Sequence, residues 1–235
     1  MKKVIARILL AFFVVTFQLI IAQDKLSPLR EAMGSNNPNE VKRLIESGAD
    51  VNEKYNVARL TNITPLFQAC TFSFLFPTAD SIKANKIEIV KLLIAGGANV
   101  NEKFMGMTIL CQAIQLTGDP AIVKLLVRGG LDINAKNYSE QTALHGAALL
   151  GKTKWLKPLI ENGADLNAKD RYCNTPLHLA IEESQTESAK ILIASGANVN
   201  LTNSSALTPL DLAIRHGNKE LADLLKKNGG KSGKE

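Results

Sequence analysis

Two histidines and a cysteine come closest, by type and spacing, to a metal site. The segments Thr142-Ala-Leu-His145 and Thr175-Pro-Leu-His178 place the histidines 33 residues apart, and Cys111, three residues after Thr108, occupies the corresponding place one repeat earlier. Imidazole and thiolate are zinc ligands and bind the ion at about 2.0–2.3 Å. If the interval marks a structural repeat, these residues lie instead on stacked helices roughly 8–10 Å apart. The spacing therefore predicts no metal site.

The sequence also lacks the motifs of a catalytic site. It contains no Gly-x-Ser-x-Gly elbow, no His-Glu-x-x-His and no pair of carboxylates in a catalytic context. Gly230-Lys231-Ser232 is similar to the end of a phosphate-binding loop, but Leu225 stands where that loop needs a glycine. We therefore predict no catalytic residues, no cofactor and no small-molecule substrate.

Composition and charge exclude further classes of protein. The 235 residues are 46% hydrophobic and 21% charged, which is typical of a folded chain. Of the 28 basic residues, Lys2, Lys3 and Arg7 lie in an N-terminal segment expected to be removed, so the mature charge is 25 minus 22, or +3. That excess is too small and too scattered to indicate nucleic-acid binding. Three cysteines are too few for a disulfide-dense fold.

Residues 1–22 are predicted to be a signal peptide. A basic start precedes an apolar stretch from Ile8 to Ala22, and Ala22 supplies the small residue expected before a cleavage site. The alternative is a membrane anchor, but an apolar stretch of about 15 residues is shorter than the roughly 20 of a spanning helix. We therefore expect an exported bacterial protein, periplasmic or secreted, rather than a membrane-anchored one.

Two markers repeat through the rest of the chain. Turn segments recur as Gly48-Ala-Asp-Val-Asn52, Gly97-Ala-Asn-Val-Asn101, Gly130-Leu-Asp-Ile-Asn134, Gly163-Ala-Asp-Leu-Asn167 and Gly196-Ala-Asn-Val-Asn200. A sixth glycine of the series, Gly229, follows Gly196 by 33 residues. A Ser or Thr suited to cap a helix precedes each of the six glycines and is often followed by proline: Ser27, Thr64, Thr108, Thr142, Thr175 and Thr208. The interval between cap and glycine is 21 or 22 residues, except for 33 in the second repeat. Each interval leaves room for two short helices that end at the glycine.

A leucine four residues before each glycine predicts the stacking core. These residues are Leu44, Leu93, Leu126, Leu159, Leu192 and Leu225. Leucines in one register on successive helices allow each repeat to bury its apolar stripe against its neighbours.

The chain thus resembles the ankyrin-repeat family, whose helix-opening tetrapeptide matches the segments that end at His145 and His178. The resemblance covers residues 26–230 as six repeats starting near residues 27, 64, 108, 142, 175 and 208. It implies an all-α solenoid of stacked helix pairs with β-hairpin fingers, histidines that bond within and between repeats, and binding to other proteins. The chain departs from the family pattern at Phe67, Ile109, Cys111, Ala143, Asp211 and at Pro158, which we expect to interrupt its helix.

The two ends carry the features of caps. Glu40 and Arg43 stand where inner repeats have Ile89 and Leu92, and the last helix ends in lysines. An open solenoid needs such polar ends to stay soluble. We therefore expect a monomer, with residues 231–235 as a frayed polar tail.

The fingers and the groove are the predicted protein-binding surface. Aromatic and basic side chains fall on the fingers at Tyr55, Lys136, Tyr138, Lys169, Arg171 and Tyr172. Tyrosine and arginine are enriched at interfaces, so the fingers would suit a partner with an acidic patch; ordinary solvated hairpin tips are the alternative. The resemblance implies that the seventh and eighth residues after each helix cap face the concave groove. In the last three repeats these positions change from apolar through acidic to basic: Leu149, Leu150, Glu182, Glu183, Arg215 and His216. That order fits a folded protein or an extended peptide better than a polyanion.

Two further features leave alternatives open. The second repeat contains an insert within residues 71–85 with Phe72, Phe74 and Phe76, which either pack beside a lengthened first helix or form an exposed binding patch. Cys70 and Cys111 fall in the first helices of adjacent repeats. They are either buried free thiols, which we favour, or a disulfide.

The sequence as a whole predicts a non-enzymatic, exported scaffold that binds a protein partner. A membrane-tethered scaffold, a toxin-neutralising protein and a host-binding effector are the alternatives.

Overall fold

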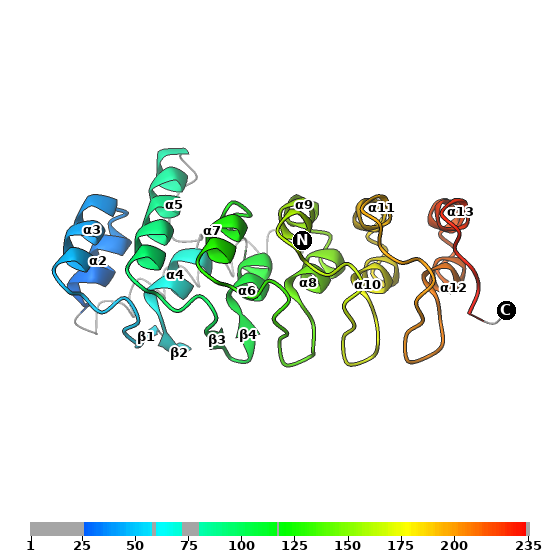
Figure 1. Cartoon of the computed structure of the whole chain (residues 1–235), viewed down its shortest axis with the longest axis horizontal. Helices are drawn as coiled ribbons and strands as arrows, with labels where there is room; N and C mark the ends of the chain where they lie inside the picture. The colour runs from blue at the N-terminus through cyan, green and yellow to red at the C-terminus, as the bar shows by residue number, and fades with distance from the viewer. Residues whose placement is uncertain (1–25, 58–59, 72–79, 117, 234–235) are drawn as a thin grey trace, which may run out of the picture.

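The structure is a row of six helix pairs with a finger between each pair and the next (Figure 1). This computed structural model describes residues 26–57, 60–71, 80–116 and 118–233. Within those residues the pairs are α2 (Pro28–Gly34) with α3 (Pro38–Glu46), α4 (Pro65–Thr71) with α5 (Asp80–Ala95), α6 (Ile109–Gln115) with α7 (Ile122–Arg128), α8 (Ala143–Leu149) with α9 (Thr153–Glu161), α10 (Pro176–Glu182) with α11 (Thr186–Ala194), and α12 (Pro209–Arg215) with α13 (Lys219–Lys227). The fold is therefore the predicted all-α solenoid.

Helix starts and stops follow the predicted chemistry. Ser27, Thr108 and Thr208 accept a hydrogen bond from the backbone N–H three residues ahead, which satisfies one free donor of the first turn. The glycine after each second helix has a positive φ of 80–92°: Gly48, Gly97, Gly130, Gly163, Gly196 and Gly229. A side chain would be strained in that conformation, so glycine ends the helix and directs the chain into the next finger.

Among the described residues, regular strands occur only in the first two fingers. β1 (Tyr55–Val57) pairs antiparallel with β2 (Leu60–Ile63), and β3 (Lys103–Phe104) pairs with β4 (Met107–Thr108). The later fingers are hairpin turns that point the same way (Figure 1). The first finger is the longer of the two, because eleven residues separate Asn52 from Thr64 and six separate Asn101 from Thr108.

A ladder of asparagines joins the turns of successive repeats. Asn134 donates its Nδ2–H to the carbonyl of Gly163 (3.2 Å) and accepts the N–H of Asp165 at Oδ1 (2.8 Å). Asn52, Asn101 and Asn200 make the same two bonds to their next turn. The last asparagine of each turn segment therefore fixes the spacing between repeats.

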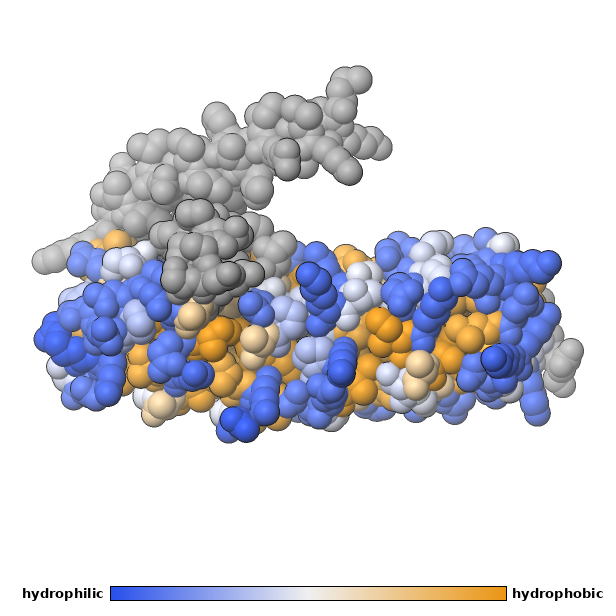
Figure 2. Space-filling view, turned by 90° about the horizontal axis from the view of Figure 1, so that it is seen from above, coloured by the Kyte–Doolittle hydropathy of each residue, from blue (hydrophilic) through white to orange (hydrophobic). Residues whose placement is uncertain are grey.

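The leucine stripe forms the core, as predicted. Leu93, Leu126, Leu159, Leu192 and Leu225 are fully buried, whereas Leu44 in the first pair is half-buried. Burial of each leucine side chain contributes about 1.5–3 kcal/mol. Seen from the side of the second helices, both ends of the row are hydrophilic and apolar side chains show between them (Figure 2).

The second pair shows where part of the extra length of the second repeat lies. Its first helix, α4, has seven residues like the other first helices, and the second helix, α5, has 16. The lengthened element is therefore α5, which extends beyond its neighbours (Figure 1). Phe72, Phe74 and Phe76 lie outside the described residues, as does the predicted signal peptide.

Pro158 does not interrupt its helix, contrary to expectation. The helix α9 continues to Glu161 with Pro158 inside it, although proline removes one backbone hydrogen bond. Trp155, Leu156 and Leu159 on the same helix are buried in the stack. Tertiary packing of that apolar face outweighs the local penalty.

The C-terminal tail is docked up to Gly233 rather than frayed. The N–H of Lys231 donates to Asn200 Oδ1 (2.8 Å), so Lys231 takes the place of the turn residue of a further repeat. The Thr208 hydroxyl donates to the Lys231 carbonyl (2.9 Å). The composition of the tail predicted fraying, but the repeated turn geometry continues into it.

Candidate functional site

The two histidines make hydrogen bonds within and between repeats, as the family resemblance implies. Nδ1 of His145 lies 3.2 Å from the backbone nitrogen of Thr142, and Nε2 lies 3.0 Å from the carbonyl oxygen of Asn174 in the next finger. A backbone N–H can only donate, so Nδ1 is the acceptor and Nε2–H donates to the carbonyl. His178 repeats this arrangement with Thr175 (3.2 Å) and Leu207 (3.1 Å).

Each ring is therefore held neutral, with both nitrogens occupied. Burial lowers the pKa of His145 and of His178, because the charged form would lose its hydration. Among the residues that the structure describes, no three His, Cys, Asp or Glu side chains are grouped so as to hold a metal ion.

Asp211 replaces the histidine in the last repeat and attaches the tail. Its carboxylate accepts the N–H of Thr208 (2.9 Å), the hydroxyl of Ser232 (2.7 Å) and the N–H of Gly233 (2.9 Å). Burial alone would raise the pKa of Asp211, but hydrogen bonds from the backbone and side chains of these residues lower it to about 2.

The cysteines are free thiols. Cys70 and Cys111 are buried and not bridged, as we favoured, and Cys173 is partly exposed. Burial raises the pKa of Cys70 to about 12 and also raises that of Cys111. The two buried thiols therefore act as small apolar side chains.

Tyr55 is not an exposed fingertip residue, which corrects that part of the predicted surface. Its ring is partly buried against the core, and its hydroxyl donates to Gln68 Oε1. The guanidinium carbon of Arg30 lies 3.9 Å from the ring centroid, within the range of a cation–π contact. Tyr55 thus fastens the first repeat to the second.

The other two predicted tyrosines are exposed at the fingertips. Tyr138 is 64% exposed and Tyr172 is 60% exposed. Met105, which sequence reasoning missed, is 74% exposed one finger before Tyr138. Met105 lies 33 residues before Tyr138, so the repeat spacing could have identified it as a fingertip residue. The fingertips therefore present a row of large apolar side chains to solvent.

Backbone hydrogen bonds between neighbouring fingers hold this row in place. The N–H of Tyr138 donates to the carbonyl of Gly106 (3.1 Å), and the N–H of Ser204 donates to the carbonyl of Tyr172 (2.9 Å). Arg171 donates from its guanidinium to the carbonyl of Tyr138. Each fingertip is thereby fixed by the next one.

Lysines form a second row on the fingers. Lys103 Nζ donates to the carbonyl of Lys136 (2.8 Å), and Lys136 Nζ donates to the carbonyl of Lys169 (2.9 Å). All three lysines are exposed, as is Arg171. The predicted basic and aromatic residues of the later fingers thus lie on one side of the molecule.

The predicted groove residues lie at the ends of successive first helices. Leu149 ends α8, Glu182 ends α10 and Arg215 ends α12, and the residue after each is its C-cap. Leu149 is half-buried, and the other five groove residues are exposed. The helices α8, α10 and α12 lie side by side (Figure 1). The apolar, acidic and basic positions at their ends therefore form one row.

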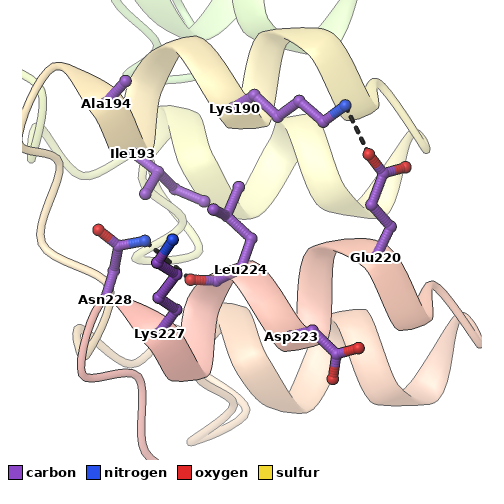
Figure 3. A pocket seen from close by; sticks show the side chains of 8 residues that line it. All are labelled: Lys190, Ile193, Ala194, Glu220, Asp223, Leu224, Lys227 and Asn228. Atoms are coloured by element: carbon purple, nitrogen blue, oxygen red, sulfur yellow. Dashed lines mark hydrogen bonds and ion pairs between the residues drawn. The ribbon is translucent and has the colours of Figure 1, made fainter.

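Two of the hollows on the described surface lie at the last repeats. A cleft of about 430 Å³ lies beside α10 and is lined by Gln141, Asp170, Tyr172, Asn174, Leu179, Glu182, Glu183, Asn203, Ser204 and Ser205. A larger hollow of about 660 Å³ lies between α11 and α13, with Ile193 and Leu224 at its base (Figure 3). At one end of the larger hollow, Lys190 pairs with Glu220 at 2.6 Å. The smaller cleft borders both the fingers and the groove.

Comparison with protein families identifies ankyrin repeats in the chain. Ankyrin repeats (3 copies) match residues 79–170 and 144–234, which together cover more than half of the sequence. The chain therefore belongs to the ankyrin-repeat family. Proteins of this family are typically non-enzymatic, and their repeats generally mediate protein–protein interaction. The curated proteins searched include no significant match.

Proposed function

We propose that this protein is an exported, non-enzymatic scaffold that binds a protein partner through its fingers and groove. The observation that carries the proposal is the exposure of Tyr138 and Tyr172 on fingers whose backbones are hydrogen-bonded to their neighbours. Large aromatic side chains that do not serve the core are typical hot spots of interfaces.

Rigidity explains how such a surface would bind. Association costs free energy whenever loops and side chains must be ordered, so an ordered surface loses less. Here the bonds between fingers and the asparagine ladder have already fixed the backbone of the binding face. The partner would meet aromatic and basic side chains at fixed intervals, which favours an acidic or mixed surface of a folded protein or an extended segment.

Export is the second part of the proposal. It rests on the basic start and the apolar stretch of residues 1–22, which lie outside the described part of the structure. Among the described residues, no helix is long and apolar enough to cross a membrane.

The test is crosslinking followed by mass spectrometry on tagged protein isolated from its native cells. We expect a stoichiometric protein partner crosslinked at Lys136 or Lys169, and a mature chain that begins at Gln23. Crosslinks confined to the second helices would contradict binding through the fingers. A chain that keeps Met1 in the membrane fraction would contradict export and support the tethered alternative.

A further inference from the structure

The cleft beside α10 is lined by three fingers and one helix. Gln141 belongs to one finger, Asp170, Tyr172 and Asn174 to the next, and Asn203, Ser204 and Ser205 to a third. The helix α10 contributes Leu179 and Glu182, and its C-cap residue Glu183 completes the lining. Three carboxylates line the cleft and no basic side chain does. This absence contrasts with the lysine row on the fingers.

Two of these carboxylates are available to a partner. Glu182 and Glu183 are exposed, and neither forms an ion pair or side-chain hydrogen bond with any residue that the structure describes. Asp170 differs, because it is buried and its Oδ1 accepts the N–H groups of Tyr172 and Asn174, both at 2.9 Å. Asp170 thus holds the turn that carries Tyr172 and adds negative charge beneath it.

The remaining wall offers an aromatic ring and free hydroxyls. The side chain of Tyr172 is 60% exposed, while its backbone carbonyl is held by the N–H of Ser204 (2.9 Å). Within the described residues, the hydroxyls of Ser204 and Ser205 make no hydrogen bond, and both serines are exposed. An aromatic face together with carboxylate and hydroxyl oxygens is the chemistry that receives an ammonium or guanidinium group.

We propose that this cleft binds a basic side chain, lysine or arginine, of the protein partner. The inference rests on the proposed function and deepens it, because it names the partner group that one part of the surface recognises. The cation would approach Glu182 and Glu183 and lie against the ring of Tyr172. Its charge would be matched by groups that have no counter-ion within the described structure.

The neighbouring residues limit what the rest of the partner can be. On one side the groove presents Leu150, which is 40% exposed, and on the other it presents Arg215. The fingers add Lys169 and Arg171. A strongly basic partner would meet repulsion there, so the segment that binds carries an isolated basic residue between apolar and acidic ones.

A pair of peptides tests the proposal directly. The full-length ¹⁵N-labelled protein is titrated with the capped tripeptide Ac-Gly-Arg-Gly-NH₂, and with the same peptide in which citrulline replaces arginine. Citrulline keeps the shape and removes the charge. We expect the arginine peptide to shift the backbone amide signals of Tyr172, Glu183 and Ser204, and the citrulline peptide to leave them in place. Equal shifts with both peptides, or none with arginine, would overturn the proposal.

Variants of the glutamates supply the second arm. Glu182→Gln with Glu183→Gln should weaken binding of the arginine peptide about 2- to 30-fold, since each of the two exposed ion pairs contributes roughly 0.2–1 kcal/mol. The matched control, Glu161→Gln with Glu187→Gln, makes the same charge change on the second helices and should leave binding unchanged. Equal binding by all three proteins would refute recognition in the cleft. Capture of a partner by the unmodified chain would still support the proposed function in that case.

Discussion

Lowering the pH should destabilise this protein through its two buried histidines. His145 and His178 each accept a backbone N–H at Nδ1 and donate from Nε2 to a carbonyl of the next finger. Protonation of Nδ1 would place its new N–H against the backbone N–H of the capping threonine. The hydrogen bond between that backbone N–H and Nδ1 at the start of the helix would then be lost. Since burial lowers both pKa values in the folded state, the unfolded chain takes up the protons first.

The magnitude follows from linkage. The stability due to these residues is complete above the unfolded histidine pKa of about 6.5 and is lost as the pH falls below it. Each proton that binds only to the unfolded chain lowers the free energy of unfolding by about 1.4 kcal/mol per pH unit. For two histidines the loss between pH 7.5 and 5.5 approaches about 2.7 kcal/mol when both stay neutral in the folded state.

Urea unfolding at successive pH values, followed by Trp155 fluorescence and circular dichroism, measures this loss. Exchange of the exposed His216 for glutamine is the control and should keep the full pH dependence. The His145→Gln, His178→Gln double variant should be less stable at pH 7.5 and should lose most of the slope between pH 7.5 and 5.5. A flat profile in the unmodified protein, or an equal slope in the double variant, would refute the reasoning.

Three further predictions concern the stack and its thiols. Asn134→Ala removes two hydrogen bonds between turns and should lower the free energy of unfolding by about 1–2 kcal/mol, measured by thermal or urea unfolding. An unchanged unfolding midpoint would mean that the asparagine ladder contributes nothing to stability. Ile181→Ala should cost about 2–5 kcal/mol because this side chain is 1% exposed, whereas Ile214→Ala at the equivalent place in the last repeat, 56% exposed, should change stability by less than about 0.5 kcal/mol. An aromatic disulfide reagent should modify Cys173 in the native protein and the other two cysteines only after unfolding; rapid native reaction of all three would contradict their burial.

The solenoid could be predicted from sequence because its determinants are local and repeated. A helix cap, a leucine four residues before a glycine and that glycine recur at one interval, and each acts within its own repeat. The docked tail was missed because residues 231–235 contain no apolar side chain that predicts packing, whereas the tail is held by bonds that Asn200, Thr208 and Asp211 make across the last repeat.

The candidate site was harder to predict because exposure depends on packing between repeats. Tyr55 and Tyr138 both fall in fingers, yet Tyr55 is packed against the core because Arg30 and Gln68 meet it from neighbouring helices. The cleft beside α10 combines residues from three fingers and one helix, so no single segment of the sequence indicates it. The row of groove residues could be predicted from the sequence because equivalent positions of successive repeats lie side by side.

The central claim is that the exposed fingertip tyrosines bind the partner. The most direct test compares partner capture from native cells by the unmodified protein, by a Tyr138→Ala, Tyr172→Ala double variant, and by Ile214→Ala as a control that truncates an exposed apolar side chain on the last helix pair. The account predicts that the double variant loses most of the capture, while its thermal unfolding and the capture by the control stay nearly unchanged. Equal capture by all three proteins would contradict it.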